Sequence, residues 1–199
     1  ICNALVFRTW HLVNDDQSWD NFLSSNPTFK TYISSPQETI TILFSSGTTG
    51  SPKAIPWNHT TPIKSAADGY YHHDIHPGDV VCWPTNLGWM MGPWLVFATL
   101  INKGTMALYY DSPLTPDFGQ FVENAKVNML GLVPSLVSAW RANSSMEKFN
   151  WQNIHCFSST GECSNPDDMN WLMNLTDGGR PIIEYCGGTE TGGGYITST

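Results

Sequence analysis

Basic residues are scarce in this chain of 199 residues, which has nine Lys and Arg against 17 Asp and Glu. The formal net charge of −8 argues against nucleic-acid binding, because a surface that follows phosphates needs clustered cations. Long apolar stretches are absent too, since no run of about 18 or more apolar residues occurs. We therefore expect a soluble protein with no membrane span and no nucleic-acid partner. Binding of a single nucleotide chelated to a metal ion is compatible with this charge.

Cysteine pairing is also absent as a pattern. The five cysteines are odd in number and scattered, and none forms a C-x-x-C pair. Neither a disulfide framework nor a zinc site is indicated, which favours a reducing intracellular compartment. Three N-x-[ST] sequons, at Asn58, Asn143 and Asn174, leave a secreted glycoprotein as the alternative.

The chain is expected to be a piece of a longer one. It begins with Ile1 rather than Met, and residues 195–199 have the β-branched character of an unfinished strand. Residues 14–36 are rich in Asp, Asn, Ser and Pro, and we expect an irregular lead-in segment over residues 1–38. We expect one domain, itself partial, over residues 39–199.

Strands and helices are expected to alternate along this domain. The predicted strands lie at residues 39–44, 80–83, 106–110, 127–133, 154–157 and 181–185. The predicted helices begin at Pro62 and Pro134 and also cover residues 94–101, 118–125 and 165–175. Such alternation predicts an α/β fold with a mostly parallel sheet flanked by helices, and a ligand crevice at the carboxyl ends of the strands.

A polar loop follows the strand at 39–44, which its apolar run predicts to be buried. The residues that we expect to bind phosphate are Ser45, Ser46, Gly47, Thr48, Thr49, Gly50 and Lys53. Glycines let backbone N–H groups approach a phosphate, hydroxyls donate to its oxygens, and the Lys53 ammonium offsets its charge. This is no Walker loop, because Pro52 and Ala54 stand where that motif needs Gly and Ser or Thr. A polar surface loop is the alternative.

The string from Phe44 to Lys53 resembles the signature of the adenylate-forming superfamily, an aromatic residue and then [ST]-S-G-T-T-G-x-P-K-G. The superfamily includes acyl-CoA synthetases, luciferases and peptide-synthetase adenylation domains. Ala54 in place of the final glycine is the single departure. The resemblance is closest to plant-type acyl-activating enzymes of the acetyl-CoA-synthetase-like branch, and it implies that residues 39–199 are part of the large N-terminal AMP-binding domain, without the C-terminal domain.

A second segment resembles the later motif of the same family, a glycine-containing aromatic turn that ends in Thr-Glu. Its residues are Tyr185, Cys186, Gly187, Gly188, Thr189 and Glu190. The resemblance assigns all but Glu190 to the nucleotide site, with Thr189 at the α-phosphate, and it assigns Mg²⁺ binding to Glu190. Lys53, Thr189 and Glu190 are then the catalytic set. A carboxylate suits Mg²⁺, which takes hard oxygen ligands. A glycine-rich turn with an incidental Glu is the alternative.

Two looser segments complete the resemblance. Thr160, Gly161 and Glu162 match the adenine-side segment, although Cys163 replaces the usual proline; Glu162 is alternatively a charge at a helix N-terminus or in a solvated turn. The stretch with Trp89, Met90 and Met91 resembles the wall of the acyl pocket, with core packing as the alternative. Gly187 aligns with a pocket-closing Trp of acetate-selective relatives, which implies an acyl group larger than acetyl.

Three histidines, His72, His73 and His76, have i, i+3 and i+4 relations that a metal site can use. No fourth ligand is evident. They fall where a helix is expected to end, so favourable interaction with the helix dipole is the alternative.

The resemblance implies an acid–thiol ligase that uses ATP, Mg²⁺ and CoA to convert a small carboxylic acid first to acyl-AMP and then to acyl-CoA. The family's ribose-binding Asp and C-terminal Lys lie beyond residue 199, so we expect this chain alone to be inactive. A non-catalytic nucleotide-binding remnant, or an adenylation domain that passes its acyl group to a carrier-protein thiol, are the alternatives. Relatives of this branch are often peroxisomal, which implies a peroxisomal or cytoplasmic location. The oligomeric state is not predicted.

Overall fold

The structure is a computed structural model, and it describes residues 23, 25, 26, 28–46 and 50–198. The chain divides into two compact units, Ile1–Ser34 and Ser35–Thr199. In the first unit the described residues form no helix or strand. Most of the lead-in predicted for residues 1–38 lies outside the described residues, so its irregularity stays a prediction there.

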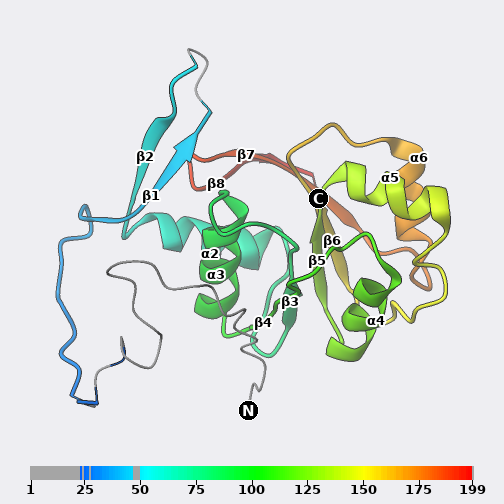
Figure 1. The fold of residues 1–199 in the computed structure, drawn as a ribbon, viewed down its shortest axis with the longest axis horizontal. Helices are drawn as coiled ribbons and strands as arrows, with labels where there is room; N and C mark the ends of the chain where they lie inside the picture. Colours follow the sequence, from blue (N-terminus) through cyan, green and yellow to red (C-terminus); the bar gives the residue numbers. More distant parts are fainter. Residues whose placement is uncertain (1–22, 24, 27, 47–49, 199) are drawn as a thin grey trace, which may run out of the picture. The chain divides into compact units, whose positions relative to one another are not determined.

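Six strands form the main sheet of the second unit, in the order β4-β3-β5-β6-β7-β8 (Figure 1). They are β3 Val80–Cys82, β4 Thr105–Ala107, β5 Met129–Leu132, β6 Cys156–Ser159, β7 Ile182–Gly188 and β8 Gly193–Thr197. All neighbours pair in parallel except β7 and β8, which are antiparallel. The predicted α/β fold with a mostly parallel sheet is confirmed.

Five helices connect or flank these strands within the described residues. They are α2 Thr61–Tyr71, α3 Met91–Ile101, α4 Pro116–Ala125, α5 Pro134–Asn143 and α6 Pro166–Met173. A proline stands at the start of α2, α4, α5 and α6. Proline fits there because the first turn has no intrahelical use for its N–H group. The helix starts predicted from Pro62 and Pro134 are therefore confirmed.

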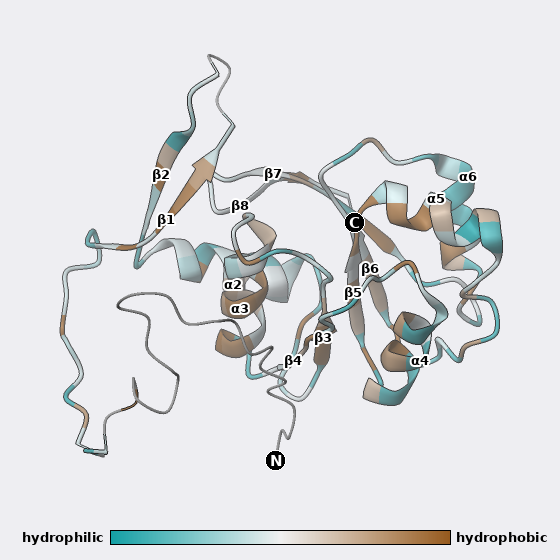
Figure 2. Cartoon of the chain, in the orientation of Figure 1, coloured by the Kyte–Doolittle hydropathy of each residue, from teal (hydrophilic) through white to brown (hydrophobic). Residues whose placement is uncertain are grey.

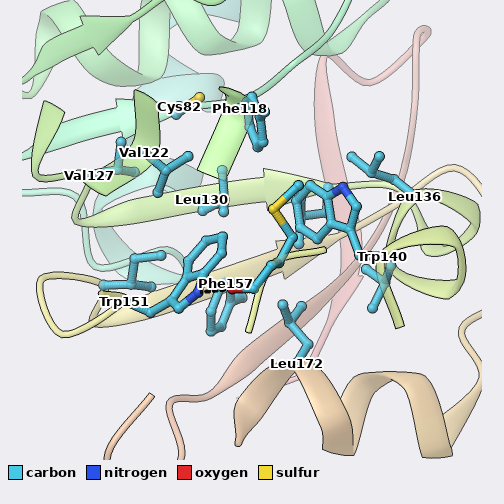
Figure 3. Close-up of a cluster of buried hydrophobic side chains, with 14 of the residues drawn as sticks. Cys82, Phe118, Val122, Val127, Leu130, Leu136, Trp140, Trp151, Phe157 and Leu172 are labelled. Atoms are coloured by element: carbon cyan, nitrogen blue, oxygen red, sulfur yellow. Dashed lines mark hydrogen bonds between the residues drawn. The ribbon is translucent and has the colours of Figure 1, made fainter. Parts of the chain in front are cut away.

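Successive strand residues point to opposite faces, and each face is covered by its own helices. On one face Leu130 and Phe157 pack against α4, α5 and α6, as Figure 3 shows with Phe118, Trp140 and Leu172. On the other face the neighbouring residues Met129 and Cys156 belong to a second core cluster, which contains Trp94, Leu95 and Ala98 of α3. The sheet is thus sandwiched between two helical layers.

Helix α3 is apolar around most of its surface, and Figure 2 colours it largely as hydrophobic. It packs closely against α2, because a Cβ on Gly69 would lie only 3.0 Å from the Cβ of Ala98. Asn102 at the end of α3 donates to the carbonyl of Ala66 over 2.8 Å. Within the described part of the chain, no helix combines the length and apolarity needed to cross a membrane.

Strands β1 Thr39–Ser45 and β2 Lys53–Asn58 form a separate antiparallel hairpin, which corrects the sequence prediction at two points. Residues 39–44 were expected to be buried, but Ile42 and Phe44 are 55% and 66% exposed. The reason is that β1 has β2 as its strand neighbour, so one face packs through Leu43 while the other stays open. Strand β2 itself was not predicted.

Candidate active site

The first motif connects the two strands of the hairpin. Ser45 ends β1 and pairs with Lys53, the first residue of β2. Gly50 has φ of 87°, a conformation that glycine adopts without strain. Ser46, Gly50 and Lys53 are exposed, whereas the predicted phosphate-binding residues Gly47, Thr48 and Thr49 lie outside the described residues. The described part of the motif is therefore an open hairpin end with one ammonium group.

The second motif runs along β7 and into the turn before β8. Thr189 and Glu190 lie in this turn, and the Trp57 indole donates to the Thr189 carbonyl over 2.7 Å. Lys53 Nζ lies 3.8 Å from Glu190 Oε1, and both side chains are more than half exposed. The structure thus brings together the cation of the first motif and the carboxylate of the second.

The third segment follows β6, next to β7. Thr160 Oγ1 donates to the Tyr185 carbonyl over 2.5 Å, which ties the segment to the second motif. The Glu162 carboxylate accepts from the backbone N–H of Ser135 over 2.9 Å and from its hydroxyl over 3.1 Å. Ser135 is in the first turn of α5, so the alternative of a charge at a helix N-terminus is realised for Glu162. Its predicted place at adenine stays a prediction.

A cavity of about 370 Å³ lies where β6 and β7 end. It is lined by Ser159, Thr160, Gly161, Glu162, Cys163, Glu184, Tyr185, Cys186 and Gly187. The cavity thus joins the predicted adenine segment to the first residues of the second motif. Both cysteines in the lining are free. Position and size fit a small-molecule site, because ligands of α/β sheets bind beyond the carboxyl ends of the strands.

A buried cluster of polar side chains from α2, α3 and β7 holds the second motif in place through hydrogen bonds. The Tyr185 hydroxyl donates to Asp68 Oδ2 over 2.6 Å and accepts from Trp94 Nε1 over 3.0 Å. Burial, with the Asp68 hydrogen bond adding to it, raises the pKa of Tyr185 far above its ordinary value, so the hydroxyl stays a donor. Burial opposes ionisation of Asp68, but hydrogen bonds from Lys64, Tyr185 and Gly194 lower its pKa overall. Asp68 therefore stays a carboxylate that fixes the start of β8 against α2.

The predicted acyl-pocket residues lie apart from this cavity. Trp89 is 68% exposed, and Met91 is buried beside Trp94 and Leu95 of α3. Met90 is partly buried and packs against both that cluster and the hairpin cluster. Core packing therefore accounts for Met91, and none of the three residues lines the cavity. Their predicted contact with substrate is a proposal.

Gly187 has a backbone reason to be glycine. A Cβ at this position would lie 2.3 Å from the carbonyl oxygen of Gly193, on the paired strand. The pairing of β7 and β8 is also irregular between Cys186 and Gly187. The close approach of two backbones thus excludes a side chain in this conformation, whatever the size of the substrate.

The three histidines do not converge. His73 is fully buried, with Nδ1 3.0 Å from the Asp68 carbonyl and Nε2 3.0 Å from Ser158 Oγ. His76 instead lies beyond α2, with Nε2 2.7 Å from Asp74 Oδ1. Nowhere in the described ranges do three or more His, Cys, Asp and Glu side chains gather to hold a metal ion. His73 does lie at the end of α2, where its ring contacts the carbonyl of Asp68 in the last turn, and it is at the same time a core residue.

Sequence reasoning missed the residues that hold the second motif in place. They are Trp57 on β2 and Lys64, Ser65 and Asp68 on α2. Their partners are mostly backbone atoms of residues 189–194, more than a hundred residues away. The i, i+4 spacing of Lys64 and Asp68 was the available signal, although it predicts only a helix-surface ion pair.

The mostly parallel sheet, flanked by helices, defines an α/β domain. A model of the AMP-binding enzyme family matches residues 5–199. The chain belongs to this family.

Curated plant proteins are similar to the chain over nearly its whole length. Hexanoyl-CoA synthase of Cannabis sativa is 53% identical over 189 residues, which cover 92% of this chain and 26% of that protein. The Arabidopsis thaliana protein named "Probable acyl-activating enzyme 17, peroxisomal" is 51% identical over 189 residues, with the same two shares, 92% and 26%. The chain therefore spans about a quarter of the length of these relatives.

Solved structures share the fold. Acetoacetyl-CoA synthetase from Streptomyces lividans superposes with a TM-score of 0.77 and 26% identity, over 89% of this chain and 28% of its own. The anthranilate CoA ligase AuaEII, in complex with anthranoyl-AMP, gives a TM-score of 0.76 over 85% of this chain and 33% of its own. Its identity is 19%, so this likeness concerns the fold alone.

Proposed function

We propose that the protein containing this chain activates a carboxylic acid with ATP to acyl-AMP and then transfers the acyl group to CoA. The observation that carries the proposal is the 3.8 Å approach of Lys53 Nζ to the Glu190 carboxylate, both exposed to solvent. Names of the relatives support the same chemistry, since they include a hexanoyl-CoA synthase and an acyl-activating enzyme.

In the first step, a carboxylate oxygen of the acid attacks the α-phosphorus of ATP, and the bond from that phosphorus to the pyrophosphate oxygen breaks. The protein's task is positioning and charge neutralisation. The Lys53 ammonium is proposed to offset negative charge on the phosphates, and Thr189 lies beside Glu190 in the same turn. A cation that stabilises charge developing in the transition state contributes to catalysis.

The residues present fit Mg²⁺ at Glu190. Mg²⁺ in nucleotide sites takes one or two carboxylates together with phosphate oxygens and water, so one accessible carboxylate is enough. The Glu190 side chain is 55% exposed, and its carboxylate lies 3.8 Å from Lys53 Nζ. At this distance Glu190 can give up the ion pair with Lys53 and bind a metal ion instead. When bound there, Mg²⁺ would neutralise phosphate charge. The Glu190 carboxylate would hold it, and Lys53 would turn toward the phosphates.

The cavity at the ends of β6 and β7 is proposed to take the adenine. Its volume of about 370 Å³ is at the lower end of the range for small-molecule sites. The hydroxyl of Thr160 is committed to the Tyr185 carbonyl, so this wall is held rigidly. Gly161 and Cys186 also line this cavity.

The acid is proposed to be larger than acetate. The support comes from the name of one relative, hexanoyl-CoA synthase. Exposed Trp89 and partly buried Met90 are the side chains proposed to touch the acyl chain. The location is proposed to be peroxisomal, as in the name of the Arabidopsis relative.

The test is a carboxylate screen of the complete protein. Pyrophosphate release is measured from MgATP with straight-chain acids of two to ten carbons, each with and without CoA. The proposal predicts release that requires the acid, turns over with CoA and is faster with medium-chain acids than with acetate. Acid-dependent release that never responds to CoA would instead indicate transfer to a carrier protein, and release without any acid would contradict acid activation.

A further inference from the structure

One hydrogen bond joins the strand that carries Lys53 to the turn that carries Glu190. Trp57 lies on β2, four residues after Lys53, and its Nε1 donates to the Thr189 carbonyl over 2.7 Å. We propose that Trp57 is a positioning residue, which sets the turn against β2 so that Lys53 and Glu190 face each other. This inference rests on the proposed function, in which those two residues bind MgATP.

Trp57 is suited to this task by its own rigidity. The side chain is 1% exposed and packs against Leu43 and Ile55 in the core of the hairpin. Because Trp57 is buried, it does not touch the nucleotide and acts only through Thr189 and Glu190. Its indole offers a single N–H donor in a fixed direction, so the bond defines the place of the Thr189 carbonyl.

The far end of the turn is anchored separately. Ser65 Oγ donates to the Gly192 carbonyl over 2.9 Å, and Gly192 has φ of 60°. A Cβ on Gly192 would lie 2.1 Å from Thr61 Cγ2, so the turn rests directly on α2. Glu190 therefore lies between two fixed points, one on β2 and one on α2. Removal of the Trp57 donor frees the Thr189 carbonyl, next to Glu190, and leaves the contact of Ser65 with Gly192 in place.

Loss of the Trp57 hydrogen bond is expected to lower the rate of adenylation as well as the stability of the fold. A displacement of about 1 Å at reacting groups can cost on the order of 10²-fold in rate. Loss of one hydrogen bond at the turn is expected to lower adenylation by about tenfold, within that limit. The Mg²⁺ concentration required for half-maximal activity should rise as well, because Glu190 is the proposed carboxylate ligand of this ion.

The experiment compares two tryptophan variants of the complete protein. Trp57→Phe removes the donor to Thr189, and Trp151→Phe is the matched control. Trp151 is 2% exposed and donates Nε1 to the Met146 carbonyl over 2.9 Å, within the main core and away from the turn. Melting temperature, MgATP affinity by calorimetry, and acid-dependent pyrophosphate release at several Mg²⁺ concentrations are measured for each variant.

Positioning predicts that both variants lose similar thermal stability, whereas only Trp57→Phe loses about tenfold in release and needs more Mg²⁺. Ser65→Ala, which loosens the other anchor, should change the reaction in the same direction if Trp57→Phe does not fold. In a Glu190→Gln background, Trp57→Phe should cause a smaller loss than in the wild type, since the part of its effect that acts through Glu190 is already gone.

Equal kinetic losses in the two tryptophan variants, unchanged kinetics in Trp57→Phe, or an undiminished loss in the Glu190→Gln background would each overturn the inference. MgATP binding without acid-dependent release in the wild type would overturn the proposed function alone, and the calorimetric comparison would still test Trp57. No MgATP binding at all would overturn both.

Discussion

Acidification should destabilise this chain through one buried imidazole, that of His73. Its ring packs against Trp94 and Tyr185, with ring centroids 4.8 and 4.7 Å away. Burial lowers the pKa of His73 from 6.5 to about 4. An unfolded chain therefore binds a proton as the pH falls through 6.5, whereas the folded chain resists until about pH 4. The contribution of neutral His73 to the free energy of unfolding is therefore fully present above pH 6.5. It is lost as the pH falls toward 4, by about 3 kcal/mol in all.

Urea unfolding at about pH 7 and about pH 4.5 measures this loss. The comparison uses the wild type, His73→Gln and the control His76→Gln, whose side chain is 43% exposed. Between the two pH values, the wild type and the control should lose roughly 2–3 kcal/mol more than His73→Gln. The same loss in His73→Gln as in the wild type would refute the assignment to His73.

Two further substitutions test the site and the core. In the complete protein, Lys53→Met should lower acid-dependent pyrophosphate release by about 10²-fold, whereas Lys103→Met, at an exposed lysine after α3, should leave it within about twofold; equal rates would contradict the role of Lys53. Gly131→Ala should lower the free energy of unfolding by roughly 1–3 kcal/mol, because the new Cβ would lie 1.9 Å from Trp83 Cδ2. In a Trp83→Leu background, Gly131→Ala should cause a smaller loss, because the clashing ring is gone, and an unchanged urea midpoint for Gly131→Ala would contradict this packing.

The parallel sheet was predictable because its signals are local. Apolar strand segments are bounded by turns, and Pro62 and Pro134 mark helix starts through their own geometry. The hairpin was not predictable in the same way. An apolar run such as residues 39–44 looks alike whether one or both faces are covered, and pairing decides between them. Pro56 also made β2 hard to predict, since proline is found mainly in edge strands and its presence argues against a strand.

The site was predictable only as far as side-chain chemistry marks it. Lys53 and Glu190 stand in recognisable motifs, and the structure places them 3.8 Å apart. The supports of the site left no such mark, because Trp57 and Asp68 bind backbone atoms of a distant turn. Any residue can supply a backbone carbonyl or N–H, so the sequence at the partner position carries no signal.

The fate of the carboxylate oxygen tests acid activation most directly. The complete protein is supplied with hexanoate labelled with ¹⁸O in both carboxylate oxygens, together with MgATP and CoA, and the products are analysed by mass spectrometry. Attack on the α-phosphorus, followed by transfer of the acyl group to the CoA thiol, leaves one labelled oxygen on AMP and none on pyrophosphate. Label in inorganic phosphate, or unlabelled AMP formed alongside hexanoyl-CoA, would contradict an acyl-adenylate.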